Sequence, residues 1–195
     1  FQPATEATRH ATRQQLHIPQ EACTLIYVGS GFERKGLRAA IQAIANSDRY
    51  LIVVGQDKQL KRYQQLANQL NCLNRIRFVG VQQDVVSFYH AADGLILPTL
   101  YDPFPNVILE AMACGLPVIT SFGCGGAEFI REGQEGFVCD ALDINALNEA
   151  VKQIPLKSTD SAMGEAARAR ILPYSPQRLA AELHALYQQV LQQHD

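Results

Sequence analysis

The stretch that decides the fold reads Tyr101-Asp-Pro-Phe-Pro-Asn-Val-Ile-Leu-Glu-Ala-Met-Ala-Cys-Gly-Leu-Pro-Val-Ile-Thr-Ser121, and an apolar run, residues 95–98, leads into it. Pro105 suits the first turn of a helix. Glu110 is the only charge between Val107 and Met112, and an unpaired buried carboxylate is costly, so we expect Glu110 to face a polar partner. A strand followed by a helix predicts that this partner lies in the crevice at the carboxyl end of the strand, where open α/β sheets bind ligands.

Short apolar runs alternate with amphipathic helical patterns along the rest of the chain. The predicted strands are residues 25–29, 50–55, 75–80, 94–97, 117–120 and 136–138. The predicted helices outside the central stretch are residues 37–44, 59–70, 85–92, 145–154, 162–171 and 175–193. This alternation predicts an α/β fold with a doubly wound, Rossmann-like parallel sheet that carries helices on both faces.

The pattern suggests three segments. Residues 1–22 contain polar helical material at residues 6–15, followed by a proline, and are interpreted as a linker or lead-in. Residues 23–172 are interpreted as the Rossmann-like domain, and residues 173–195 as a C-terminal helix that packs on this domain. The chain begins with Phe1 rather than Met, which suggests a piece of a longer protein.

The composition narrows the function classes. A net charge of −2 without a dense Lys/Arg stripe argues against a nucleic-acid surface, and no apolar run is long enough to span a bilayer, so we expect small-molecule partners. The five cysteines are odd in number and follow neither disulfide nor metal-ligand spacing. We interpret them as reduced core residues of a cytoplasmic protein, with Cys124 in a glycine loop as the one possible exception.

A glycine-rich loop, Gly29-Ser-Gly-Phe-Glu-Arg-Lys-Gly36, follows the first strand and opens the first helix, a place that favours an anion. A Walker loop needs lysine after the last glycine, whereas Lys35 precedes it, and a dinucleotide fingerprint needs glycine where Arg34 stands. Arg34 and Lys35 instead offer cationic donors to a phosphate. The alternative is a glycine turn with two solvated bases.

Two carboxylates of the central stretch are candidate ligands for hydroxyl groups. Asp102 and Glu110 accept charge-assisted hydrogen bonds, which suits ribose or sugar hydroxyls, and spacing alone does not make them an acid/base pair. Asp102 is alternatively a turn residue before proline, and Glu110 a member of a buried salt bridge. His90 receives no role.

Taken together, these motifs resemble the retaining glycosyltransferases of family four, which have the GT-B fold. The resemblance rests on Asp102-x7-Glu110 followed by Ala-Met-Ala-Cys-Gly, and it covers almost the whole chain. The loop Gly29 to Gly36 and the segment Val53-Val-Gly-Gln-Asp-Lys58 are most similar to the bacterial lipopolysaccharide core glucosyltransferases. By this resemblance the chain is the C-terminal, nucleotide-sugar-binding half of a GT-B enzyme.

The resemblance also implies roles for individual residues. Glu110 would bind the ribose hydroxyls, Lys35 the diphosphate and Asp102 a hydroxyl of the donor sugar. Gly31 is a further implied contact to the nucleotide-sugar donor, and Arg34 would replace an arginine that the family usually has at the position of Ser30. The backbone of Gly80 and Val81 would contact the base. The amides of Phe104, Asn106 and Val107 would contact the sugar and the phosphate.

The implied reaction is a metal-independent transfer that needs no cofactor. Its donor would be a nucleotide sugar, UDP-glucose, and its acceptor a lipopolysaccharide core heptose bound through an N-terminal domain that this chain does not contain. The chain alone would then bind the donor without transferring sugar. The resemblance further implies a cytoplasmic enzyme at the inner face of the inner membrane, whose membrane contact is peripheral and made by the other half.

The sequence departs from the family pattern at several points. The first acid is the shorter Asp102, Pro105 stands where a glycine is usual and has no N–H to donate, and Gly125, Gly126 and Glu128 are one residue closer than usual. Two other classes remain open. One is a nucleotide-binding regulatory module without catalysis, and the other a dinucleotide oxidoreductase, in which Asp57 would stand one residue late.

Overall fold

The computed structural model describes residues 1–156 and 162–192 and contains one six-stranded parallel sheet in the order β3-β2-β1-β4-β5-β6. The strands are β1 (Thr24–Val28), β2 (Tyr50–Val54), β3 (Ile76–Gly80), β4 (Gly94–Leu97), β5 (Val118–Ser121) and β6 (Gly136–Cys139). Every strand that the sequence predicts is present. The chain winds outward from β1 to β3, returns to β4 beside β1, and winds outward again to β6, so the doubly wound, Rossmann-like sheet is confirmed.

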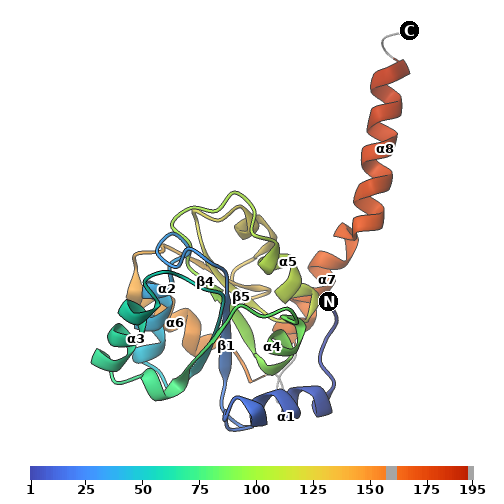
Figure 1. Ribbon diagram of the computed structural model, residues 1–195. Coiled ribbons are helices and arrows are strands. Elements are labelled where there is room, and N and C mark those ends of the chain that lie inside the picture. Colours follow the sequence, from blue (N-terminus) through green and yellow to red (C-terminus); the bar gives the residue numbers. More distant parts are fainter. Residues whose placement is uncertain (157–161, 193–195) are drawn as a thin grey trace.

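Helices cover both faces of the sheet (Figure 1). The α-helices are α1 (Glu6–Gln15), α2 (Leu37–Ala45), α3 (Leu60–Gln69), α4 (Val86–Ala91), α5 (Asn106–Ala113), α6 (Ile144–Gln153), α7 (Ala162–Ile171) and α8 (Pro176–Gln192). The described residues also contain three short 3₁₀ helices, which the sequence does not predict: η1 (Leu73–Arg75), η2 (Gly125–Phe129) and η3 (Leu172–Tyr174). Helix α2 packs with α3 and α6 on one face of the sheet. On the other face, α1 packs against α4, and α5 packs against α7.

The central strands are apolar along nearly their whole length because both of their faces are covered. Leu25, Ile26 and Tyr27 of β1 and the facing residues of β2 are almost completely buried. Helix α2 buries one stripe, with Leu37, Ile41 and Ile44 against the sheet. The core therefore lies on both sides of β1, β2 and β4. Because these strands are parallel, the loops that follow them all lie at the carboxyl-terminal edge of the sheet.

The interpretation of residues 1–22 as a linker is wrong, because α1 is part of the domain. Arg13 is fully buried, and its guanidinium donates to Asp93 at 2.7 Å and to four backbone carbonyls. Arg9 donates to the other oxygen of Asp93 at 2.6 Å. These charges fasten α1 beside the start of β4. A polar helix usually indicates solvent exposure, but here Arg13 is buried with a partner 80 residues away and Arg9 is partly buried beside it.

The expectation that residues 173–195 pack on the domain is also wrong for the part that the structure describes. Helix α8 projects away from the sheet and helices (Figure 1), and its described side chains are exposed. The exposed apolar residues of this helix are Leu179, Leu183, Leu186, Tyr187, Val190 and Leu191. An amphipathic stripe predicts a helix with one apolar face but does not say what that face lies against. Nowhere in residues 1–156 and 162–192 is there a helix both long and apolar enough to cross a membrane.

Candidate functional site at the carboxyl ends of the strands

A cluster of three charges lies where the winding direction of the sheet reverses, between the loops after β1 and β4. The Oδ2 atom of Asp102 lies 3.2 Å from Nη1 of Arg34 and 3.4 Å from Nζ of Lys35. Asp102 is 7% exposed, whereas the side chain of Arg34 is 52% exposed and also donates to the carbonyl of Tyr101 at 2.6 Å. The three residues that the sequence suggests for phosphate and sugar thus meet at the topological switch point.

The backbone of Asp102 is held by the glycine loop after β5. Asp102 donates its N–H to the carbonyl of Gly123 at 3.0 Å and accepts from the N–H of Gly125 at 2.9 Å, and it forms a bridge with Cys124. A Cβ atom at Gly125 would come within 1.7 Å of the Pro103 carbonyl oxygen, so only glycine allows this approach. The glycine loop therefore supports the aspartate, and Cys124, which is 3% exposed, is a buried thiol like the other four.

A cavity of about 260 Å³ opens at the carboxyl ends of β1, β2 and β3. Its lining residues are Val28, Gly29, Ser30, Val54, Gly55, Val81, Gln82 and Val85. The Lys35 side chain lies close to Gly29, one of these lining residues, since a Cβ atom at Gly29 would stand only 3.2 Å from Nζ. Gly80 ends β3 at an irregular register and accepts the N–H of Gly55 at 2.8 Å. Val81 therefore lines this cavity directly, whereas Lys35 adjoins it through Gly29.

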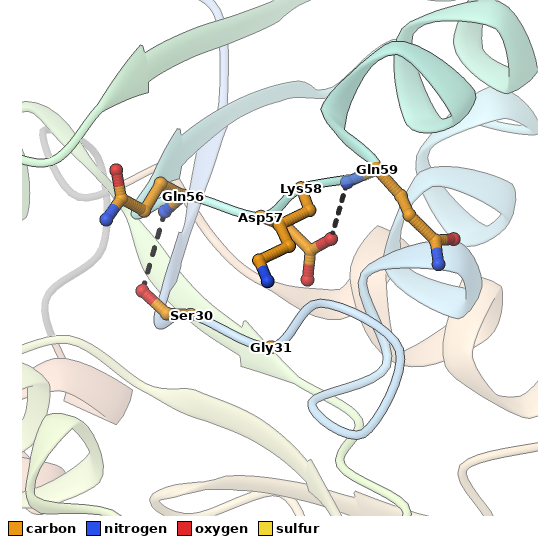
Figure 2. A pocket seen from close by; sticks show the side chains of 6 residues that line it. All are labelled: Ser30, Gly31, Gln56, Asp57, Lys58 and Gln59. Carbon is orange, nitrogen blue, oxygen red and sulfur yellow. Dashed lines mark hydrogen bonds between the residues drawn. The ribbon is translucent and has the colours of Figure 1, made fainter.

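A larger, polar pocket of about 660 Å³ lies between the loops after β1 and β2 (Figure 2). Its lining residues are Ser30, Gly31, Gln56, Asp57, Lys58 and Gln59. The Asp57 carboxylate accepts the N–H of Phe32 at 2.9 Å and of Gln59 at 2.8 Å, so it joins the two loops and begins α3. A dinucleotide oxidoreductase would need such an acid to hold ribose. Because this carboxylate is occupied by backbone donors, the oxidoreductase alternative loses its main support.

Helix α5 starts at Asn106, directly after Pro105. The first N–H groups of a helix have no partner within it, so the amides of Asn106 and Val107 lie where the sequence places amide contacts to a ligand. Phe104 is 41% exposed and packs edge-on against Phe129 with ring centres 5.8 Å apart. The helix start is therefore anchored by an aromatic contact rather than by a capping side chain.

Glu110 has the polar partner that the sequence predicts, and this partner is Tyr89 of α4. The Tyr89 hydroxyl donates to Oε2 of Glu110 at 2.9 Å. Glu110 is half-buried and, together with Asn106, lines a pocket of about 470 Å³. The other lining residues of this pocket are Phe1, Gln2, Leu109, Ala113, Arg168, Ile171, Leu172, Tyr174 and Ser175. No cation forms a salt bridge with Glu110 in the part of the chain that the structure describes, which disfavours the buried salt bridge.

The structure brings some predicted residues together and separates others. Arg34, Lys35 and Asp102 are in contact, whereas Glu110 lines a different pocket from Val81. The sequence did not indicate Tyr89, because nothing in the local pattern relates α4 to α5. Within residues 1–156 and 162–192 no group of three or more His, Cys, Asp and Glu side chains is arranged to hold a metal ion.

Comparison with known proteins gives one consistent family. The family model described as "Glycosyl transferases group 1" matches residues 8–170. Lipopolysaccharide core biosynthesis glycosyltransferase LpsE of Rhizobium meliloti is 33% identical over 143 residues, which cover 73% of this chain and 42% of that protein. Lipopolysaccharide glucosyltransferase WaaG of Escherichia coli is 34% identical over 161 residues, which cover 77% of this chain and 43% of that protein.

Solved structures agree with this family. The crystal structure of WaaG matches with a TM-score of 0.74 and 32% identity over 86% of this chain and 47% of that one. Anabaena Alr3699/HepE, solved in complex with UDP and glucose, matches with a TM-score of 0.81 over 94% of this chain and 53% of that one, and at 23% identity it shows a shared fold alone. The chain spans a little under half the length of the curated relatives named above.

Proposed function

The chain belongs to the group 1 glycosyltransferases, and on that premise we propose that it is the nucleotide-sugar-binding half of a retaining, metal-independent hexosyltransferase. The proposed donor is UDP-glucose and the proposed acceptor a heptose of the lipopolysaccharide core. The names of LpsE, a lipopolysaccharide core biosynthesis glycosyltransferase, and WaaG, a lipopolysaccharide glucosyltransferase, support the glucose and the lipopolysaccharide core of this proposal. Acceptor binding and any peripheral membrane contact are assigned to the remaining half of a longer, cytoplasmic protein.

The observation that supports donor binding best is the charge cluster at the switch point. Arg34 and Lys35 on one loop share the Asp102 carboxylate on the other. A diphosphate entering this crevice would take the cationic donors of Lys35 and Arg34, because phosphate oxygens accept charge-assisted hydrogen bonds. The Asp102 oxygens would then be available to a hydroxyl of the donor sugar, which adjoins the diphosphate in a nucleotide sugar.

The rest of the nucleotide fits the neighbouring elements. The base is proposed to lie at Gly80 and Val81, at the cavity beyond β2 and β3, and the ribose hydroxyls at Glu110. The free amides at the start of α5 and the loop at Gly31 complete the phosphate and sugar contacts. In this arrangement the chain holds and orients the donor, and orientation is a large part of what such a half contributes to transfer.

Calorimetric titration of the chain with UDP, UDP-glucose and NAD tests the proposal. We expect binding of UDP and UDP-glucose and none of NAD. Glu110→Ala should weaken UDP binding by about 1 to 3 kcal/mol, the usual scale for a lost hydrogen bond to a charged group. A folded Glu110→Ala variant with unchanged UDP affinity would remove the ribose assignment. UDP binding with no dependence of UDP-glucose binding on Asp102 would instead favour a regulatory nucleotide-binding module.

A further inference from the structure

Tyr89 is the only side chain recorded in hydrogen-bond contact with Glu110 among the described residues. The ring is completely buried, and its hydroxyl is its one polar atom. Glu110, by contrast, is half-buried and borders an open pocket with Asn106 from the preceding turn of α5. One oxygen of the carboxylate is therefore held from the protein side, and the carboxylate as a whole faces a space that a ligand can enter.

We propose that Tyr89 is a positioning residue of the donor site: its hydroxyl holds Oε2 of Glu110 so that Oε1 stays directed at the ribose hydroxyls of the nucleotide. This inference rests on the proposed function. A glutamate side chain that is free to rotate loses conformational entropy when a ligand orders it, and this loss weakens binding. A hydrogen bond present before the ligand arrives reduces that cost at the moment of binding.

A neutral donor suits this role better than a cation would. An arginine or lysine at position 89 would compensate the carboxylate charge, whereas a phenol orients the group and leaves its negative charge to strengthen hydrogen bonds from ligand hydroxyls. Burial, and then the charge of Glu110, raise the pKa of the Tyr89 hydroxyl well above its usual value. The phenol therefore remains protonated and keeps donating throughout the neutral pH range.

The position of Tyr89 also connects the two ends of the proposed nucleoside site. Helix α4 follows Val85, which lines the cavity that contains Val81, and Tyr89 comes one turn later. The residue therefore lies between the loop assigned to the base and the carboxylate assigned to the ribose. Phe1 covers the ring edge-on with ring centres 5.9 Å apart, which leaves the phenol little room to turn away.

The test compares UDP with 2′,3′-dideoxy-UDP, which lacks the hydroxyls that Glu110 would bind. In the wild-type chain UDP should bind more tightly than the dideoxy analogue. Tyr89→Phe keeps the ring and removes only the hydroxyl, so we expect UDP affinity to fall about tenfold, as for one lost hydrogen bond of this kind, while affinity for the analogue stays the same. In a Glu110→Ala background, Tyr89→Phe should cause no further loss.

Tyr27→Phe is the matched control. Tyr27 is also fully buried, but no hydrogen-bond partner of its hydroxyl is found among the described residues. This variant should bind UDP and the analogue as the wild type does. Equal weakening of both ligands by Tyr89→Phe would show a merely structural role and overturn the inference, as would an unchanged UDP affinity. Absence of UDP binding by the wild-type chain would refute the proposed function itself, so the two failures are distinguishable.

Discussion

Replacing Asp102 by Asn removes one negative charge between Arg34 and Lys35 while keeping the size of the side chain. In the structure the Asp102 Oδ2 atom lies 3.4 Å from Lys35 Nζ. A phosphate oxygen on the far side of Nζ would lie about 6 Å from that carboxylate. At this distance the repulsion between two unit charges is about 0.7 kcal/mol at the dielectric constant of water and about 2.8 kcal/mol at an effective dielectric constant of 20. Asp102 itself is buried, but Arg34 beside it is half-exposed and the incoming phosphate keeps contact with water, so we use the lower figure as the minimum gain.

The variant should therefore bind UDP about threefold more tightly, because the repulsion between carboxylate and diphosphate is gone. UDP-glucose should behave in the opposite way. Asp102→Asn replaces a charged acceptor for the sugar hydroxyl by a neutral one, and a hydrogen bond to a charged group is worth about 1.5 to 3 kcal/mol. That loss exceeds the electrostatic gain, so we expect UDP-glucose to bind about tenfold more weakly.

Calorimetry with both ligands at one ionic strength measures the two changes. Asp48→Asn removes the same charge from a side chain that is 92% exposed, in the turn before β2, and should leave both affinities unchanged. If Asp102→Asn weakens UDP and UDP-glucose by equal factors in a folded protein, then Asp102 is a structural residue of its loop. The separation of its counter-ion and sugar-binding roles would then be refuted.

Three further substitutions test other parts of the structure. Lys35→Ala should weaken UDP binding far more than uridine binding, since only UDP presents the diphosphate; equal losses in calorimetry would contradict the assignment. Arg13→Met removes one of the two arginines that pair with the buried Asp93, so it should lower the free energy of unfolding, measured in urea, by about 3 kcal/mol. A decrease of less than about 1 kcal/mol would argue against the packing of α1 on the domain. Burial raises the pKa of the Glu135 carboxyl. The hydrogen bonds and the charge of Arg131 lower this pKa by a larger amount, so the pKa in the folded protein is below its usual value. The Glu135 carboxylate therefore stabilises the fold at pH values above its unfolded pKa of about 4.3, and this contribution is lost as the pH falls through the folded pKa. Glu135→Gln should make the free energy of unfolding less dependent on pH in the acid range. An unchanged pH dependence would refute the pairing with Arg131.

The sheet could be predicted from the sequence because its signals are local. Each strand is an apolar run with a punctuating residue beside it, and α2, α3 and α8 each show an apolar stripe, so the boundaries of these elements agree with the structure within about two residues. Glu110 was predicted to have a polar partner by the same kind of local reasoning. The identity of that partner was not predictable, because Tyr89 reaches it from a helix 21 positions earlier in the chain.

One residue of the sequence, Asp93, argues against the interpretation of residues 1–22 as a linker. Asp93 stands between Ala92 and the start of β4, a lone carboxylate at the entrance to a buried strand, much as Glu110 stands in an apolar helix. A buried carboxylate needs a partner at either position. At Asp93 this partner comes from α1, whose Arg9 and Arg13 both pair with it.

The charge cluster shows why spacing alone does not predict that Lys35 contacts Asp102. Lys35 and Asp102 are far apart in sequence and meet because β1 and β4 are adjacent while their following helices leave toward opposite edges of the sheet. Two cations and one carboxylate leave one net positive charge at the switch point. UDP carries about one more negative charge than UDP-glucose, because its terminal phosphate has a second ionisation with a pKa near 6. A site with Arg34 and Lys35 alone would therefore hold the product more firmly than the donor. If the proposed function holds, Asp102 would oppose that preference by repelling the extra charge while accepting a hydroxyl that only the donor sugar presents, so one carboxylate would favour both donor binding and product release.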